Sequence, residues 1–256
     1  MRRIGIAALL LVLSIGAGFG LFWRANARPA AYGPLGPGER YLALGDSLAA
    51  GFTVGDPAEA YVARLATVLR QIRPDTTVTN LAVPGETSRS LRARQLPRAL
   101  EWIAQERAAG RRVSPITLDI GGNDARAVER ADRSTRETAI REVEQNLGYA
   151  LDRLLAATRD RAGRRTADIA VMDYYNPYGG DPADPESPAY WTERLNAAIR
   201  RAAAVRGVPV ADVATAFGGG LMYRYTYITT GDIHANADGH RVIADQFWRA
   251  LGYPAP

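Results

Sequence analysis

The sequence contains no cysteine and no lysine. The absence of cysteine excludes disulfide bonds, thiol nucleophiles and cysteine-ligated metal sites. The absence of lysine excludes the phosphate-binding loop that depends on that residue, and no Gly-x-Gly-x-x-Gly pattern follows a predicted strand, so a nucleotide-binding function lacks its motifs. Histidine is scarce as well. His234 and His240 are the only two, so one of them must supply any imidazole base.

The positive charge of the chain is carried by arginine alone. All 32 basic residues are arginine, against 27 acidic residues, which gives a formal charge of +5. The arginines are scattered among the acids and form no single stripe, a pattern typical of solvated surfaces. We therefore expect no nucleic-acid partner. The densest group, Arg89, Arg92, Arg94 and Arg98, could flank the mouth of an active site and weakly favour anionic substrates.

The N-terminal residues have the pattern of a leader. Two arginines precede an apolar run over residues 4–23, and we predict that residues 1–27 are a signal peptide or an N-terminal membrane anchor. Ala25-Asn26-Ala27 offers a cleavage site, whereas the run is long enough to span a bilayer. Both alternatives place the protein outside the cytoplasm, either secreted or anchored to the outer face of the cytoplasmic membrane. Residues 28–39 are predicted as a linker and residues 40–256 as the folded domain.

Strand and helix signals alternate through this domain. Strands are predicted at residues 41–45, 76–83, 113–120, 167–174 and 208–211, and helices at residues 58–72, 97–109, 140–155, 191–205 and 242–251. Such alternation with short connections favours a parallel sheet covered on both faces. Right-handed crossovers then give an α/β fold, a three-layer α/β/α sandwich with about five strands. The proline-rich stretch 176–188 is expected to be a loop beside the substrate cleft.

A serine stands just after the first predicted strand, where ligands bind in open α/β sheets. It belongs to Gly45-Asp46-Ser47, and Gly85, the run 121–124 and the run 232–234 follow downstream. A serine hydroxyl needs an imidazole base and hydrogen-bond donors for the oxyanion that forms on attack. These residues predict a nucleophilic hydrolase. The Gly-x-Ser-x-Gly elbow is not its motif, because Ala49 occupies the second glycine position.

Four motifs in this order resemble the SGNH/GDSL hydrolase family over residues 40–250. They are Gly45-Asp46-Ser47-Leu48, then Asn80-Leu81-Ala82-Val83-Pro84-Gly85-Glu86-Thr87, then Gly121-Gly122-Asn123-Asp124, and finally Asp232-Ile233-His234-Ala235-Asn236 with Gly239. The resemblance implies a flavodoxin-like fold and a serine esterase or lipase that uses no cofactor and no metal. Its substrate would be a small-molecule, lipid or glycan ester. Carbohydrate O-acetyl esters, lysophospholipids and thioesters all fit such a site.

The resemblance also implies a role for each matching residue. Ser47 would be the nucleophile. Its backbone N–H would form the oxyanion hole together with the Gly85 N–H and the Asn123 side-chain amide. His234 would act first as general base and then as the acid that protonates the leaving group.

One position departs from the family pattern. The family places its acid three residues before the histidine, where this chain has Gly231. Either Asp232 orients the imidazole of His234 as the catalytic acid of a triad, or a backbone carbonyl does so and leaves a dyad. A catalytically silent envelope protein that binds a glycan or a partner is the alternative function, supported only by this shifted acid. The second histidine, His240, is predicted to be partly exposed on the last helix.

Overall fold

The computed structural model describes residues 33–254, and its central element is a five-stranded parallel sheet. The strands are β1 (Arg40–Leu44), β2 (Thr77–Asn80), β3 (Val113–Leu118), β4 (Ile169–Met172) and β5 (Val210–Ala211). They lie in the order β2-β1-β3-β4-β5, and every neighbouring pair is parallel. Each strand falls on one of the five predicted runs. In this order the winding direction reverses between β1 and β3, which creates a crevice at their carboxyl ends.

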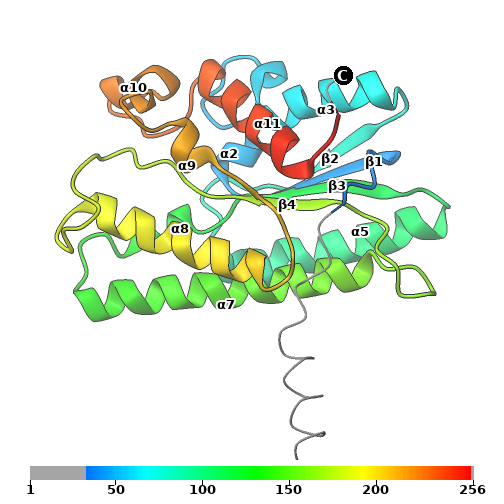
Figure 1. The fold of residues 1–256 in the computed structure, drawn as a ribbon, viewed down its shortest axis with the longest axis horizontal. Coiled ribbons are helices and arrows are strands. Elements are labelled where there is room, and N and C mark those ends of the chain that lie inside the picture. Colours follow the sequence, from blue (N-terminus) through cyan, green and yellow to red (C-terminus); the bar gives the residue numbers. More distant parts are fainter. Residues whose placement is uncertain (1–32, 255–256) are drawn as a thin grey trace, which may run out of the picture. The chain divides into compact units, whose positions relative to one another are not determined.

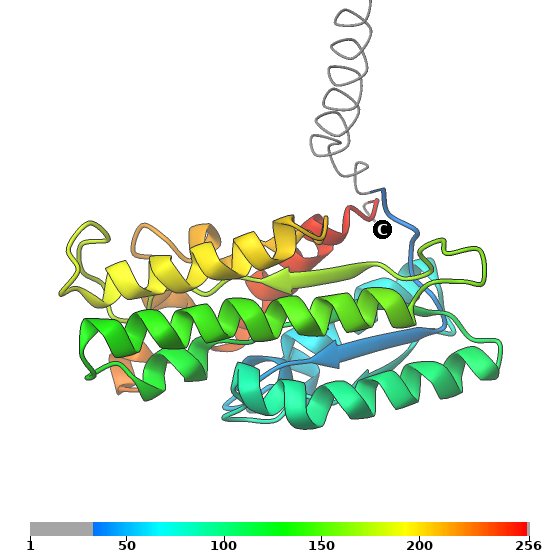
Figure 2. The same cartoon turned by 90° about the horizontal axis from the view of Figure 1, so that it is seen from below.

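Helices cover both faces of the sheet (Figure 1). One layer contains α3 (Tyr61–Ile72) and α11 (Ala237–Leu251), and the other contains α5 (Leu96–Ala108), α7 (Arg133–Ala157) and α8 (Pro188–Ala204). Figure 2 shows the second layer from below, with α7 and α8 side by side. The predicted three-layer sandwich is confirmed. The shorter elements are α2 (Ser47–Ala50), η1 (Pro57–Glu59), α4 (Ser88–Ser90), η2 (Leu91–Gln95), α6 (Gly122–Ala127), α9 (Val213–Ala216), α10 (Met222–Tyr225) and η3 (Ile228–Thr230).

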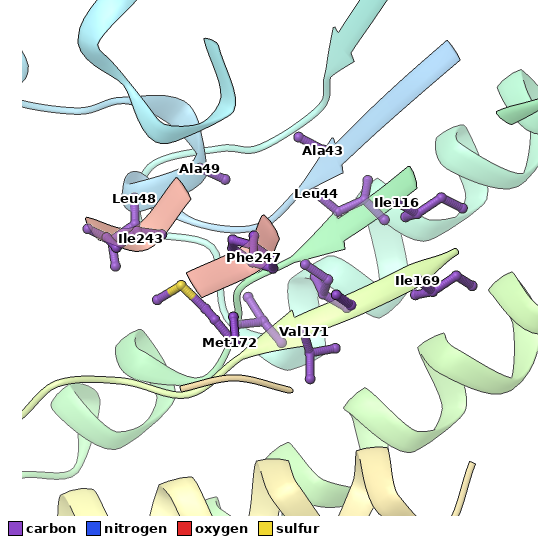
Figure 3. Packing of buried hydrophobic residues seen from close by; sticks show 14 of the residues in the cluster. Ala43, Leu44, Leu48, Ala49, Ile116, Ile169, Val171, Met172, Ile243 and Phe247 are labelled. Carbon is purple, nitrogen blue, oxygen red and sulfur yellow. The ribbon is translucent and has the colours of Figure 1, made fainter. Parts of the chain in front are cut away.

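The hydrophobic core lies between the sheet and the two helical layers. Ile243 and Phe247 of α11 belong to the same buried cluster as Leu44 of β1, Ile116 of β3 and Val171 of β4 (Figure 3). The strands β3 and β4 are buried along their whole length. Burial on both faces explains why these strands appear in the sequence as largely apolar runs without polar alternation.

His240 is buried, so its predicted position at the surface is wrong. Its relative exposure is 0%, and its Nδ1 accepts a hydrogen bond of 3.1 Å from the Tyr61 backbone N–H. An Nδ1 that accepts carries no hydrogen, so the ring is neutral and its hydrogen is on Nε2. The helical periodicity of the sequence is sufficient to predict that His240 is buried. His240 precedes Ile243 by three residues and Phe247 by seven, which places all three on the buried face of α11.

Acid is expected to destabilise the domain through His240. Burial, with the fields of Arg64 and His234, lowers the pKa of His240 to about 4 from 6.5. A depressed histidine pKa gives stability that is complete above the unfolded value and is lost as the pH falls from 6.5 toward 4, here about 3 kcal/mol. His240→Asn keeps an acceptor for the Tyr61 N–H but does not titrate. Urea unfolding from pH 7 to pH 4 is therefore expected to show a shallower loss of stability in this variant, and equal slopes would contradict the assignment.

The described part of the predicted linker, residues 33–39, contains no helix or strand. It is nevertheless fixed to the fold. The buried Asp168 accepts hydrogen bonds from the backbone N–H groups of Leu35, at 2.9 Å, and Gly36, at 3.0 Å. The leader predicted at residues 1–27 lies outside the described residues. Within residues 33–254, no helix combines the length and the apolar character needed to cross a membrane.

Candidate active site

Ser47 is the first residue of α2 and stands three residues after the end of β1. The turn before it is fixed by its neighbours. Asp46 caps α2 by accepting a hydrogen bond of 3.0 Å from the Leu48 N–H. Gly45 has a φ of +148°, and a Cβ there would lie 2.3 Å from Asp119 Oδ1, so only glycine fits. The turn presents Ser47, half-buried, at the crevice between β1 and β3.

Ser47, His234 and Asp232 form a continuous hydrogen-bonded relay. Ser47 Oγ lies 3.0 Å from His234 Nε2, and His234 Nδ1 lies 2.5 Å from Asp232 Oδ1. The same carboxylate oxygen also accepts the His234 backbone N–H at 2.9 Å. Because a carboxylate accepts at Nδ1, the imidazole hydrogen is there, and Nε2 is free to take the serine proton. The structure thus places a carboxylate against Nδ1, although this acid stands only two residues before the histidine.

The surroundings of the relay favour an ionised Asp232. Burial alone would raise its pKa, but hydrogen bonds from the His234 N–H and imidazole, together with the charge of Arg126, hold the pKa of Asp232 below its usual value. The side chain of His234 is only 16% exposed, against 40% for Asp232. The ring of Phe52 packs edge-to-face against the imidazole, with centroids 5.1 Å apart. A shielded imidazole beside an ionised acid can accept a proton and be stabilised as imidazolium.

The three predicted oxyanion donors differ in whether they already have an acceptor and in whether their residues line the cavity. Within residues 33–254 the backbone N–H groups of Ser47 and Gly85 have no acceptor, and Gly85 has a φ of +80°, which favours glycine. Asn123 is in α6, which begins just after β3, and its Nδ2 donates to the Glu86 carbonyl at 3.0 Å, leaving its second hydrogen available. Asn123 lines the same cavity as Ser47, whereas Gly85 is not among the lining residues.

Asn123→Ala is expected to lower kcat about 100-fold, the usual effect of removing one oxyanion donor. KM is expected to change little, because the negative charge develops only in the transition state. Steady-state kinetics on a p-nitrophenyl ester measures both constants. A kcat within about threefold of wild type would remove Asn123 from the oxyanion hole.

A buried polar contact beneath the serine turn was not predicted from the sequence. The Gln95 side chain accepts from the Gly45 N–H at 3.0 Å and donates to the Gly45 carbonyl at 2.8 Å. Its Nε2 also donates to the Glu86 carboxylate at 2.7 Å. Gln95 therefore joins the turn that carries the serine to the loop that carries Gly85. Nothing in the local sequence around a single glutamine signals this contact.

Asp119 supports the same turn from the end of β3. Its Oδ2 accepts from the N–H groups of Asp46 and Ala49, both at 3.3 Å, and its Oδ1 accepts from the Tyr61 hydroxyl at 2.7 Å. Asp46 in turn accepts from the Tyr174 hydroxyl at 2.7 Å. Burial, followed by the neighbouring Asp46 carboxylate, raises the pKa of Asp119 well above its usual range and so favours its protonated form. The only feature of the sequence that could have indicated this role is that Asp119 is an acid at the end of a largely apolar predicted strand.

A cavity of about 320 Å³ opens beside Ser47 and His234. Its size is at the lower end of the range for small-molecule sites. The walls come from α6, α7, α8 and the loop at residues 176–188, which was expected beside the cleft. Most of the lining is apolar or aromatic and includes Ile140, Tyr174, Tyr175, Tyr178, Trp191 and Leu195. Tyr174, Tyr175 and Tyr178, the three tyrosines that follow β4, all line the cavity.

The arginine group at residues 89–98, which the sequence suggested could flank the mouth, is not among the residues that line this cavity. Arg89 instead pairs with Glu142 of α7 at 2.9 Å. The basic residues that do line the cavity are Arg126, Arg130 and Arg136. Within residues 33–254, no three histidine, aspartate or glutamate side chains are grouped so that they could hold a metal ion.

Comparisons with known proteins identify the family and the fold. Residues 43–242 match the profile of the GDSL-like Lipase/Acylhydrolase family. Similar solved structures include Axe2, an acetylxylan esterase from Geobacillus stearothermophilus, with 20% identity, a TM-score of 0.60, and coverage of 87% of this chain and 98% of that chain. They also include TesA (21%, 0.60, 83% and 97%) and an extracellular lipase from Streptomyces rimosus (21%, 0.54, 82% and 99%). At these identities the likeness shows a common fold. No curated protein sequence matches the chain.

Proposed function

The chain belongs to the GDSL-like lipase/acylhydrolase family, and on that premise we propose that it hydrolyses carboxylic esters through an acyl-enzyme at Ser47. Family membership identifies an ester-hydrolysing enzyme. The observation that supports the residue assignment is the relay from Ser47 Oγ through His234 to Asp232, with distances of 3.0 Å and 2.5 Å. A protein that only binds a glycan or a partner does not require a serine whose proton can pass to a base.

In the first half-reaction, Ser47 Oγ attacks the ester carbonyl carbon while its proton passes to His234 Nε2. The new Oγ–C bond forms as the carbonyl electron pair moves to oxygen. The N–H groups of Ser47 and Gly85 and the Asn123 amide donate hydrogen bonds to that oxyanion. The intermediate collapses, the ester C–O bond breaks, and Nε2 gives its proton to the departing alcohol.

In the second half-reaction, water takes the place of the alcohol. His234 removes a proton from the water as it attacks the acyl carbon, and then returns a proton to Ser47 Oγ as the carboxylic acid leaves. Asp232 holds the imidazole in one tautomer and one orientation through both steps, and its charge stabilises the imidazolium that forms in each.

Hydrolysis of p-nitrophenyl acetate and p-nitrophenyl octanoate by the whole chain, purified in detergent, tests this proposal. Because the cavity lining is mostly apolar, we expect the octanoate to have the higher kcat/KM. A fluorophosphonate is expected to modify Ser47, which peptide mass spectrometry can locate. An inert chain that hydrolyses neither ester and takes up no fluorophosphonate would contradict the mechanism. A preference for acetate would instead favour an O-acetyl esterase.

We also propose that the enzyme acts outside the cytoplasm, either secreted or held on the outer face of the cytoplasmic membrane. The support is the sequence of residues 1–27, in which early arginines precede a long apolar run. Alkaline phosphatase fused to the C-terminus of the full chain tests this location, because that reporter needs disulfide bonds. An active fusion supports export, and an inactive one contradicts it. The mass of the purified N-terminus separates cleavage from anchoring.

A further inference from the structure

Arg136 is a cation in the cavity wall whose side chain has no hydrogen-bonding partner within residues 33–254. It belongs to α7 and lines the cavity that also contains Ser47 and His234. Its Cζ lies 5.3 Å from the centre of the Trp191 ring of α8. Its Nε is buried and has no hydrogen-bond acceptor among the described residues. A buried donor without an acceptor destabilises the folded protein, so a ligand that supplies an acceptor would be bound favourably by this guanidinium.

No carboxylate of residues 33–254 accepts a hydrogen bond from the Arg136 guanidinium. Glu129 and Glu186 also line the cavity, but both are exposed and neither lies within 4.0 Å of Arg136. One turn earlier on α7, Arg133 is paired with Glu137 at 2.9 Å. The lack of a partner therefore distinguishes Arg136 from its neighbour on the same helix. Arginine binds carboxylates through two parallel hydrogen bonds, and a ligand carboxylate would supply both acceptors.

The position of the base determines which part of an ester reaches Arg136. The leaving alcohol must stay within reach of His234 Nε2, which protonates it. The acyl part is then free to extend past α6 toward the wall formed by α7 and α8. Ile140, Trp191 and Leu195 make most of this wall apolar, and Arg136 is the one cation that these two helices add to the lining. An acyl group that fills the cavity therefore needs an apolar middle and an anionic end.

We propose that the cavity binds acyl chains that end in a carboxylate, as in half-esters of dicarboxylic acids, and that Arg136 holds this carboxylate. The inference rests on the proposed acyl-enzyme at Ser47 and adds a substrate class to it. A guanidinium that is partly removed from water and lies over the Trp191 ring binds a carboxylate more strongly than a surface arginine does. The exposed Glu129 and Glu186 oppose this attraction only weakly, because water and salt screen their charges.

The test measures kcat/KM for matched pairs of p-nitrophenyl esters. One member of each pair is the half-ester of adipic, suberic or sebacic acid, and in the other an isopropyl group replaces the terminal carboxylate. For at least one length, the wild-type enzyme is expected to prefer the anionic member about tenfold. In Arg136→Met this ratio falls to about one, mainly through a higher KM, as loss of a binding contact predicts. Arg136→Lys keeps a charge and retains part of the preference.

Arg133→Met is the matched control. Arg133 lies on the same helix, is 64% exposed and does not line the cavity, so the variant is expected to keep the wild-type ratio. The proposal is wrong if the neutral esters are hydrolysed but no half-ester is preferred at any length. It is also wrong if the preference survives Arg136→Met or is lost equally in Arg133→Met. Failure of both members of every pair would instead contradict the acyl-enzyme mechanism itself.

Discussion

Ser47→Ala is expected to lower kcat about a millionfold and to leave the fold intact. The hydroxyl is the atom that forms the acyl bond, and loss of a serine nucleophile has an effect of this size in other serine hydrolases. The described structure gives the Ser47 side chain one hydrogen bond, to His234, so its removal disturbs little packing. Turnover of a p-nitrophenyl ester measures the loss, and the midpoint of thermal unfolding measures the fold.

Ser134→Ala serves as the control for this variant. Ser134 is exposed on α7, remote from the relay, and its substitution is expected to leave both turnover and the unfolding temperature unchanged. The assignment of the nucleophile would fail if Ser47→Ala kept more than about a hundredth of wild-type turnover. It would also fail if the fluorophosphonate still modified the Ser47→Ala chain.

Asp232→Asn is expected to lower kcat about 10⁴-fold. An amide in place of the carboxylate turns an NH₂ group toward His234 Nδ1, which favours the tautomer with its hydrogen on Nε2. That nitrogen can then no longer accept the Ser47 proton. His234→Ala should be more damaging and should match Ser47→Ala, since the serine and its base act as a unit. Rates from pH 6 to pH 9 would show that no shift of optimum explains the loss.

Asp238→Asn provides the comparison for Asp232→Asn. Asp238 is exposed in the first turn of α11 and does not contact the relay, so near-normal turnover is expected. A loss of less than about tenfold in Asp232→Asn would mean that the carboxylate is dispensable and that the enzyme functions as a Ser47–His234 dyad. In that case the 2.5 Å contact would serve only to shape the loop.

The sheet could be predicted because its strands are buried on both faces and appear as short apolar runs. Ser47 and Asn123 line the same cavity because both come after the carboxyl ends of parallel strands, whereas the sequence assigned Asn123 to the site through the family resemblance. The contact of Asp232 could not be derived in this way. It depends on a local turn in which one carboxylate oxygen accepts from both the backbone and the ring of His234. Spacing alone left a carbonyl equally acceptable.

The turns before α5 show a different limit. The sequence predicted a helix from Pro97, but helical turns begin at Ser88 and continue through the wide turn Leu91–Gln95 into α5. Proline has no N–H to donate, and its ring crowds the carbonyl four residues earlier, so it usually marks a helix start. Leu91–Gln95 is a π-helical turn, in which each N–H bonds to the carbonyl five residues earlier, so a different carbonyl faces the proline ring. The hydrophobic periodicity of the sequence does not predict a π-helical turn.

The cavity was the part least accessible to sequence reasoning. Arg136 and Trp191 are 55 positions apart on different helices and meet only because α7 and α8 pack together. In the sequence, Arg136 is one of 32 arginines with nothing to distinguish it. Its distinguishing feature is that Nε has no acceptor among residues 33–254, and this can be recognised only from the three-dimensional structure.

Ser47 and His234 are separated by 187 residues along the chain. A ribosome that adds about 5–20 residues per second delivers the imidazole about 10–40 s after the hydroxyl. Throughout that interval the nascent serine has no base and no ordered acid, so it is an ordinary alcohol. The growing polypeptide is therefore inert toward any ester it encounters during its synthesis. Because the base follows the nucleophile by 187 residues, catalytic competence arises only after the intervening part of the domain has been synthesised.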